Sequence, residues 1–171
     1  GLDNTLTKAI MTKAKKNPKR VVYADAENLT VLKAIQQVIQ EKIAYPILLG
    51  NRKLIMNILE ENSISLPEDI DIIDPKESKN ESEKIRLAEF ADLFFDKRKR
   101  KGLTKPDAMN FVTRRSYYAS LMVETGLADT MIGGLTRNYP DTIRPALQII
   151  GPEKGVKKIS SMYILMTKKG P

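Results

Sequence analysis

Residues 129–150 decide the fold of this chain, and their sequence is DTMIGGLTRNYPDTIRPALQII. The first four residues are a short apolar run that predicts a buried strand, and residues 143–150 have the pattern of a helix. Glycines, hydroxyl groups and two arginines gather where the strand gives way to the helix. In an open α/β sheet, ligands bind outside the carboxyl ends of the strands, and a helix start offers free N–H groups to an anion. The segment therefore predicts a site for a phosphorylated ligand. A plain βα turn whose arginines face water is an equally common explanation of the pattern.

The candidate contacts of this ligand are glycines, short polar side chains and arginines. Glycine lets the backbone approach a ligand or adopt positive φ, and the forked guanidinium of arginine suits phosphate. Threonine and asparagine are either donors or helix caps, and Arg144 is either a phosphate ligand or a surface partner of Asp141. We expect the ligand to contact Gly133, Gly134, Thr136, Arg137, Asn138, Thr142 and Arg144.

The rest of the chain alternates between helical and extended patterns. A β-branched run or an apolar run predicts strands at 20–24, 46–49, 69–73, 129–132 and 159–166. Apolar residues at helical spacing predict helices at 6–15, 28–42, 52–60, 81–100, 106–111, 116–125 and 143–150. Asn28 is a candidate N-cap and Gly102 a candidate left-handed C-cap. Strands separated by helices predict an α/β fold with a mainly parallel sheet that has helices on both faces.

Composition excludes several classes of site. The 171 residues include no cysteine and no histidine, so disulfides, thiol chemistry and histidine bases or ligands are absent from this chain. The nine glycines form neither a dinucleotide fingerprint nor a phosphate-binding P-loop. No apolar run approaches a membrane span, and we expect a cytoplasmic protein without a membrane partner. The net charge of +8 fits an anionic ligand; nucleic acid is the weaker alternative, because the basic clusters lack interleaved aromatics.

Several other side chains have both a functional and a structural explanation. The run from Lys97 to Lys101 ends a helix, where cations are stabilising and face water. Asp25 and Glu27 follow the first strand and are predicted to cap the next helix rather than to act as acids and bases. Large side chains in the predicted helix at 116–125 and the predicted strand at 129–132 are expected in the core or at a subunit interface, namely Tyr117, Tyr118, Met122 and Met131.

The segment from Asp141 to Ile150 resembles the D-T-x-R-P-A-L-Q helix start of the phosphotransacetylase (phosphate acetyl/butyryltransferase) family. Four further segments are similar to the family in the same order, and the resemblance runs from about residue 3 to the end. They are Lys19 to Glu27, Pro46 to Gly50, the basic segment from Arg98 to Gly102, and Ser116 to Ala119 with Met122 and Val123.

This resemblance implies an isocitrate/isopropylmalate dehydrogenase-like architecture of two α/β domains around a cleft. Residues 1–151 would form an incomplete first domain, and residues 152–171 the junction and the opening strand of the second. Arg98 and Arg144 match family positions that contact coenzyme A or phosphate. The family's catalytic residues lie in a closing segment that no part of this chain matches, so no catalytic residue is assigned. The resemblance thus predicts a fragment that binds acyl-CoA and belongs to a homo-oligomer, a dimer.

The turn at residues 135–140 lacks the histidine and small residues of free-standing family members. With residues 160–165, it is similar to the phosphotransacetylase-like domain at the end of NADP-dependent malic enzymes. That similarity implies regulatory binding of acetyl-CoA, with NADP and a divalent metal only in the parent's malic domain, outside this chain. The alternative is part of a true phosphate acetyltransferase, which makes acetyl phosphate and coenzyme A from acetyl-CoA and phosphate.

Overall fold

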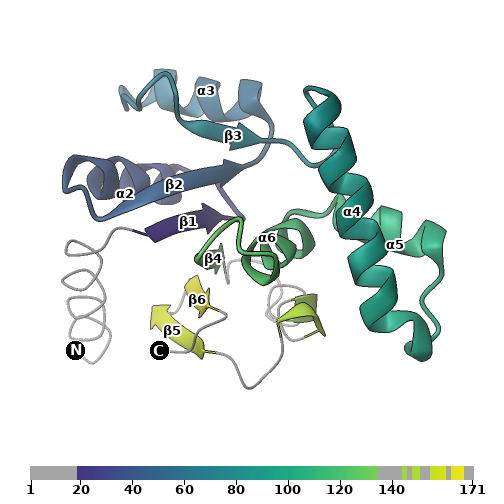
Figure 1. Cartoon of the computed structure of the whole chain (residues 1–171). Helices are drawn as coiled ribbons and strands as arrows, with labels where there is room; N and C mark the ends of the chain where they lie inside the picture. Colours follow the sequence, from purple (N-terminus) through teal and green to yellow (C-terminus); the bar gives the residue numbers. More distant parts are fainter. Residues whose placement is uncertain (1–18, 135–143, 146–147, 151–154, 161–162, 168–171) are drawn as a thin grey trace.

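The sheet of this protein is mainly parallel, as predicted. A computed structural model describes residues 19–134, 144–145, 148–150, 155–160 and 163–167. Within these residues the strands lie in the order β3-β2-β1-β4-β6-β5, and the first four are parallel (Figure 1). The strands are β1 (Lys19–Tyr23), β2 (Ala44–Leu49), β3 (Asp71–Ile73), β4 (Thr130–Gly134), β5 (Gly155–Ser160) and β6 (Tyr163–Thr167).

The helices begin at side-chain caps that the sequence supplies. The oxygen atoms of Asn28, Asn51, Asn80 and Thr104 each accept a hydrogen bond from the backbone N–H three residues later. Gly102 has a φ of 90° and ends a short 3-10 helix, η1 (Lys99–Lys101), as predicted. The described α-helices are α2 (Leu29–Gln40), α3 (Arg52–Glu61), α4 (Glu81–Arg98), α5 (Lys105–Val112) and α6 (Arg115–Glu124). None of them has the length and apolar character that crossing a membrane requires.

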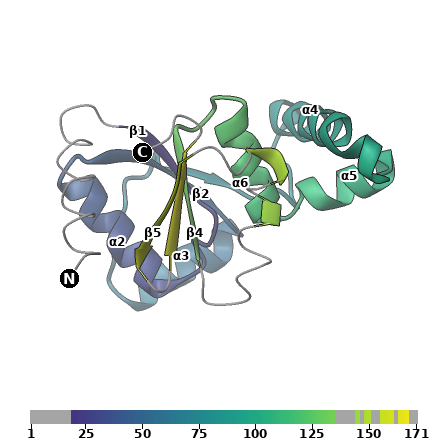
Figure 2. The same ribbon diagram turned by 90° about the horizontal axis from the view of Figure 1, so that it is seen from below.

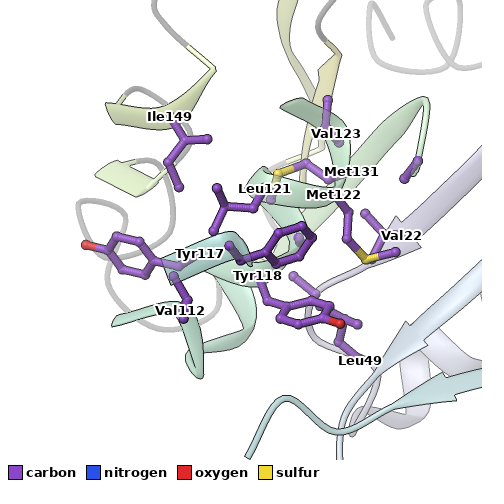
Figure 3. Close-up of a cluster of buried hydrophobic side chains, with 14 of the residues drawn as sticks. Val22, Leu49, Val112, Tyr117, Tyr118, Leu121, Met122, Val123, Met131 and Ile149 are labelled. Atoms are coloured by element: carbon purple, nitrogen blue, oxygen red, sulfur yellow. The ribbon is translucent and has the colours of Figure 1, made fainter. Parts of the chain in front are cut away.

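Side chains that alternate along β1 divide the core into two clusters. Val21 and Tyr23 pack with the apolar residues of α2 and α3, whereas Val22 and Ala24 pack with those of α4, α5 and α6. Figure 2 shows these two groups of helices from below. The tyrosines of α6 are buried in the second group, and their rings leave the helix in different directions (Figure 3). The expectation that Tyr117, Tyr118, Met122 and Met131 lie in the core is thus confirmed.

The end of the chain differs from the prediction of one strand at 159–166. It forms two strands, β5 and β6, which pair antiparallel with each other, and β6 pairs antiparallel with β4. The pairing extends from Thr130 to Gly134, so Gly133 and Gly134 continue the strand instead of forming the predicted turn. Apolar spacing alone cannot show this, because the hydrogen-bonding partner of a strand lies elsewhere in the sequence. The domain boundary at residue 151 stays a prediction, and the predicted helix at 6–15 lies outside the described residues.

Candidate ligand-binding cleft

An open cleft of about 840 Å³ lies beyond the carboxyl end of β1. The chain leaves β1 toward β2, whereas β4 lies on the other side of β1, so the strand order reverses at this point. Such a reversal is where open α/β sheets bind their ligands. Residues from the end of β1, the segment after β3, the three helices of one face and the helical turns after β4 line the cleft. They are Ala24, Asp25, Glu27, Lys76, Phe94, Arg98, Lys101, Gly102, Leu103, Asp107, Phe111, Arg114, Arg115, Ser116, Tyr117, Arg144 and Gln148.

Cations outnumber acids among these lining residues. Six are arginine or lysine and three are aspartate or glutamate. Low-dielectric walls concentrate the field of such a set and raise the local concentration of an anion. The described residues contain no group of three acidic side chains able to hold a metal ion. The excess of cations over acids in its lining suits the cleft to an anionic ligand.

The basic run at the end of α4 divides between solvent and the cleft. Lys97 Nζ lies 3.4 Å from Glu124 Oε2, and Lys99 Nζ lies 3.5 Å from Asp96 Oδ1. Arg98 is half-buried and lines the cleft, and it makes no ion pair within the described part of the chain. Lys101 is exposed, as expected for a helix end, but it also lines the cleft. Arg98 is thus available to an incoming anion without first breaking an ion pair.

Arg144 reaches the same cleft from a distant part of the sequence. It is exposed, and with Gln148 it lines the cleft together with residues that precede β4 in the chain. The structure therefore brings together Arg98 and Arg144, and their contact with a ligand stays a prediction. Gly133 and Gly134 lie in β4, paired with Ile164 and Tyr163. The other predicted contacts lie outside the described residues, namely Thr136, Arg137, Asn138 and Thr142.

Glu27 and Arg115 form a bidentate ion pair that the sequence did not predict. Glu27 was expected to cap the next helix, but Asn28 caps α2, and Glu27 turns into the cleft instead. Arg115 Nη2 lies 2.6 Å from Glu27 Oε1, and Arg115 Nη1 lies 2.9 Å from Glu27 Oε2. One signal was available. A cation at the first position of a helix opposes the helix dipole, so Arg115 needs an acidic partner.

Aromatic rings form part of the wall of the cleft. The guanidinium carbon of Arg114 lies 4.5 Å from the centre of the Phe111 ring, a cation–π contact. Phe111 in turn packs against Phe94 and Tyr117, with ring centres 5.9 and 5.0 Å apart. The ring on which Arg114 rests is therefore itself packed against two other rings of the cleft wall.

Comparison with known proteins identifies the family. The model of the phosphate acetyl/butaryl transferase family matches residues 5–171. The chain belongs to this family.

Curated relatives in this family are phosphate acetyltransferases. The chain is 34% identical over 161 residues to the phosphate acetyltransferase of Thermoanaerobacterium thermosaccharolyticum, covering 94% of this chain and 46% of that protein. It is 32% identical over 158 residues to the enzyme of Helicobacter pylori, covering 92% of this chain and 29% of that protein. The chain thus spans less than half the length of these family members.

Solved phosphotransacetylases share the fold. A phosphotransacetylase from Streptococcus pyogenes superposes with a TM-score of 0.75 at 27% identity, over 91% of this chain and 45% of that one. The EutD phosphotransacetylase from Staphylococcus aureus superposes with a TM-score of 0.72 at 24% identity, over 95% of this chain and 49% of that one. The comparisons establish the phosphate acetyl/butaryl transferase family, and they do not extend to a malic enzyme parent.

Proposed function

We propose that this chain supplies the acyl-CoA-binding part of a phosphate acyltransferase. In that reaction a phosphate oxygen attacks the thioester carbonyl carbon, the carbon–sulfur bond breaks, and coenzyme A leaves as its thiolate. The observation that carries the proposal is the meeting of Arg98 and Arg144 at one cationic cleft beside the strand-order reversal. The names of the curated relatives, phosphate acetyltransferases, support the same reaction.

In this proposal the two arginines bind phosphate groups of coenzyme A. Arginine forms two parallel charge-assisted hydrogen bonds to a phosphate, and each such contact contributes about 1.5–3 kcal/mol. The aromatic wall beside Arg114 and the open form of the cleft leave room for the rest of the ligand. No described residue is assigned to bond breaking, and the chain's own contribution is to bind and orient the thioester.

Titration calorimetry with coenzyme A tests this proposal. Arg144→Ala is expected to raise Kd roughly tenfold to a hundredfold, since about 1.4 kcal/mol is tenfold. Arg144→Lys is expected to restore only part of the loss, because lysine keeps the charge and lacks the fork. Lys99→Ala is the matched control: it removes one charge from a residue that pairs with Asp96 and does not line the cleft. Equal effects of Arg144→Ala and Lys99→Ala would contradict a built site and leave only a general positive field.

A regulatory acetyl-CoA domain of an NADP-dependent malic enzyme is the second candidate. The sequence of residues 135–140 and the absence of histidine favour it. The two functions differ in turnover. Release of free coenzyme A from acetyl-CoA and phosphate by the full-length protein supports the acyltransferase. Binding without turnover, together with an effect of acetyl-CoA on malate oxidation, supports the regulatory domain, and the coding sequence that flanks this chain tests it independently.

A further inference from the structure

The carboxylate of Glu27 is a meeting point for three segments at the edge of the cleft. It accepts two hydrogen bonds from Arg115, at 2.6 and 2.9 Å, and a third from the backbone N–H of Asn51, at 2.7 Å. The side chains of Arg115 and Glu27 are only 28% and 19% exposed. A bidentate charge-assisted pair with so little exposure holds its partners in a fixed geometry more firmly than a solvated ion pair does.

The backbone around Glu27 is shaped to receive it. Glu27 follows β1, Asn51 caps α3 after β2, and Arg115 is the first residue of α6. A Cβ atom added at Gly50 would lie 3.1 Å from Glu27 Cγ, closer than ordinary contacts, so glycine makes room for the side chain. The N–H of Gly50 also donates to the carbonyl of Ile73 at 3.0 Å, which ties the end of β3 to the same point.

The first turn of helix α6 meets this carboxylate through Arg115. No side chain caps α6, and no acidic residue lies in its first turn. The positive guanidinium of Arg115 therefore meets the positive end of the helix dipole, and Glu27 offsets that repulsion. Arg114 and Ser116, on either side of Arg115, line the cleft. Displacing this turn would move the cationic wall.

We propose that Glu27 is a positioning residue, which acts through Arg115 to hold the first turn of α6 and the cationic wall where the ligand's phosphates bind. This inference rests on the proposed function. A purely structural ion pair is available for comparison at the other end of the same helix. Lys97 lies 3.4 Å from Glu124, with side chains 30% and 15% exposed, and neither residue lines the cleft.

Removing the charge of Glu27 distinguishes a positioning role from a purely electrostatic one, because the two roles change the affinity for an anion in opposite directions. Glu27→Gln makes the cleft more positive by one charge and keeps a side-chain oxygen for the N–H of Asn51. If the cleft acted only through its field, the variant would bind an anion more tightly. If Glu27 positions the wall, the variant binds more weakly, although its charge is more favourable.

The experiment compares Glu27→Gln with Lys97→Met in two measurements. The first is titration with coenzyme A, for which Glu27→Gln is expected to raise Kd about tenfold, because misplacement of binding groups by about 1 Å can cost that much or more. The second is hydrogen exchange of the Tyr118 amide, which donates to the carbonyl of Arg114 at 2.9 Å and closes the first turn of α6. That amide is expected to exchange faster in Glu27→Gln and no faster in Lys97→Met at equal global stability.

Unchanged or tighter binding by Glu27→Gln overturns the inference, as does equal weakening by Lys97→Met. If the wild-type chain does not bind coenzyme A, the proposed function is wrong, and exchange alone decides positioning. Faster exchange confined to the first turn of α6 then supports it, and unchanged exchange overturns it. If Glu27→Gln does not fold, Arg115→Lys takes its place. That variant keeps the charge and loses the fork, so weaker binding with a looser first turn supports positioning, and wild-type values in both measurements overturn it.

Discussion

The two faces of the sheet are packed by different kinds of side chain. The face under α2 and α3 is aliphatic apart from Tyr23, with Leu32, Ile35 and Ile55 fully buried. The face under α4, α5 and α6 contains five aromatic rings that form four contacting pairs, with ring centres 4.9 to 5.9 Å apart. Phe94, Phe111 and Tyr117 contact one another, and Phe90 contacts Tyr118.

The difference matters because only the aromatic face continues into the cleft. Phe94, Phe111 and Tyr117 line the cleft and also pack in or against the core beneath it. On this face the same rings stabilise the fold and shape the site. On the aliphatic face, the residues that stabilise the fold do not line the cleft. Variants on the aromatic face are therefore expected to lose both stability and ligand binding, whereas variants on the aliphatic face are expected to lose stability alone.

The largest expected effect comes from truncating one core side chain on each face. Phe94→Ala is expected to lower the free energy of unfolding by about 3–5 kcal/mol, and Leu32→Ala by about 2–5 kcal/mol. Phe94→Ala is also expected to weaken coenzyme A binding under conditions in which both variants are folded, whereas Leu32→Ala leaves it near the wild-type value. Denaturant unfolding and calorimetry measure the two quantities. Equal retention of binding by both variants would show that the rings do not shape the site.

Removing one cation from each face sharpens the comparison. Arg98→Ala is expected to weaken coenzyme A binding by about 1.5–3 kcal/mol, since a charge-assisted contact to phosphate is lost. Lys53→Ala, on α3, removes the same charge away from the cleft and is expected to have little effect. A pantetheine thioester lacks the nucleotide phosphates. The difference in its affinity for Arg98→Ala and Lys53→Ala should therefore be smaller than the difference measured with coenzyme A. Similar losses with both ligands would contradict a phosphate contact at Arg98.

The hydroxyl of Tyr118 is a weakness of the aromatic face. It is buried, and no described residue meets it with good hydrogen-bond geometry, although the guanidinium of Arg86 lies close enough to interact with it. Burial raises the pKa of Tyr118, and this outweighs the lowering by the nearby guanidinium of Arg86. Because an unpaired buried hydroxyl is costly, Tyr118→Phe is expected to be neutral or to raise stability by about 1 kcal/mol. Thermal unfolding of the variant measures this, and a clear loss of stability would reveal a partner for the hydroxyl.

The smallest effect is expected at the end of the sheet opposite the cleft. Asp129 accepts hydrogen bonds from the backbone and side chain of Arg20. Burial raises the pKa of Asp129, but these hydrogen bonds and the charge of Arg20 lower it by a larger amount. The net effect is a pKa below the ordinary value for aspartate. The stabilisation is therefore present above the ordinary carboxyl pKa and is lost as pH falls through the lowered value.

Asp129→Asn tests that pH dependence. The pair is partly exposed, so the variant is expected to lose only about 0.5 kcal/mol at neutral pH. The difference from wild type should begin to shrink as pH falls below about 4, where the unfolded chain takes up the proton, and should disappear once the pH is also below the lowered pKa of the folded chain. Coenzyme A binding should not change. A stability difference that grows as pH falls would show that the sign is wrong.

Local patterns predicted most of the regular structure. The helices α2 to α6 begin and end within about two residues of the prediction, because apolar spacing, asparagine and threonine caps and Gly102 act over a few neighbouring residues. The strands β5 and β6 were predicted as one strand. The prediction missed the division into two strands because it depends on pairing with β4 and with each other, which local apolar spacing does not show. The misassigned role of Glu27 has a similar origin: its partner, Arg115, lies far away in the sequence.

By itself, the sequence determined the α/β class, the cationic character and the family motifs, all of which are carried by neighbouring residues. Only the tertiary structure showed that Arg98 and Arg144 line one cleft and that Glu27 pairs with Arg115 at the start of α6. The physical reason is that strand order and helix packing set the distances between residues remote in sequence. Those distances result from burial of both sheet faces at once, which no local pattern specifies.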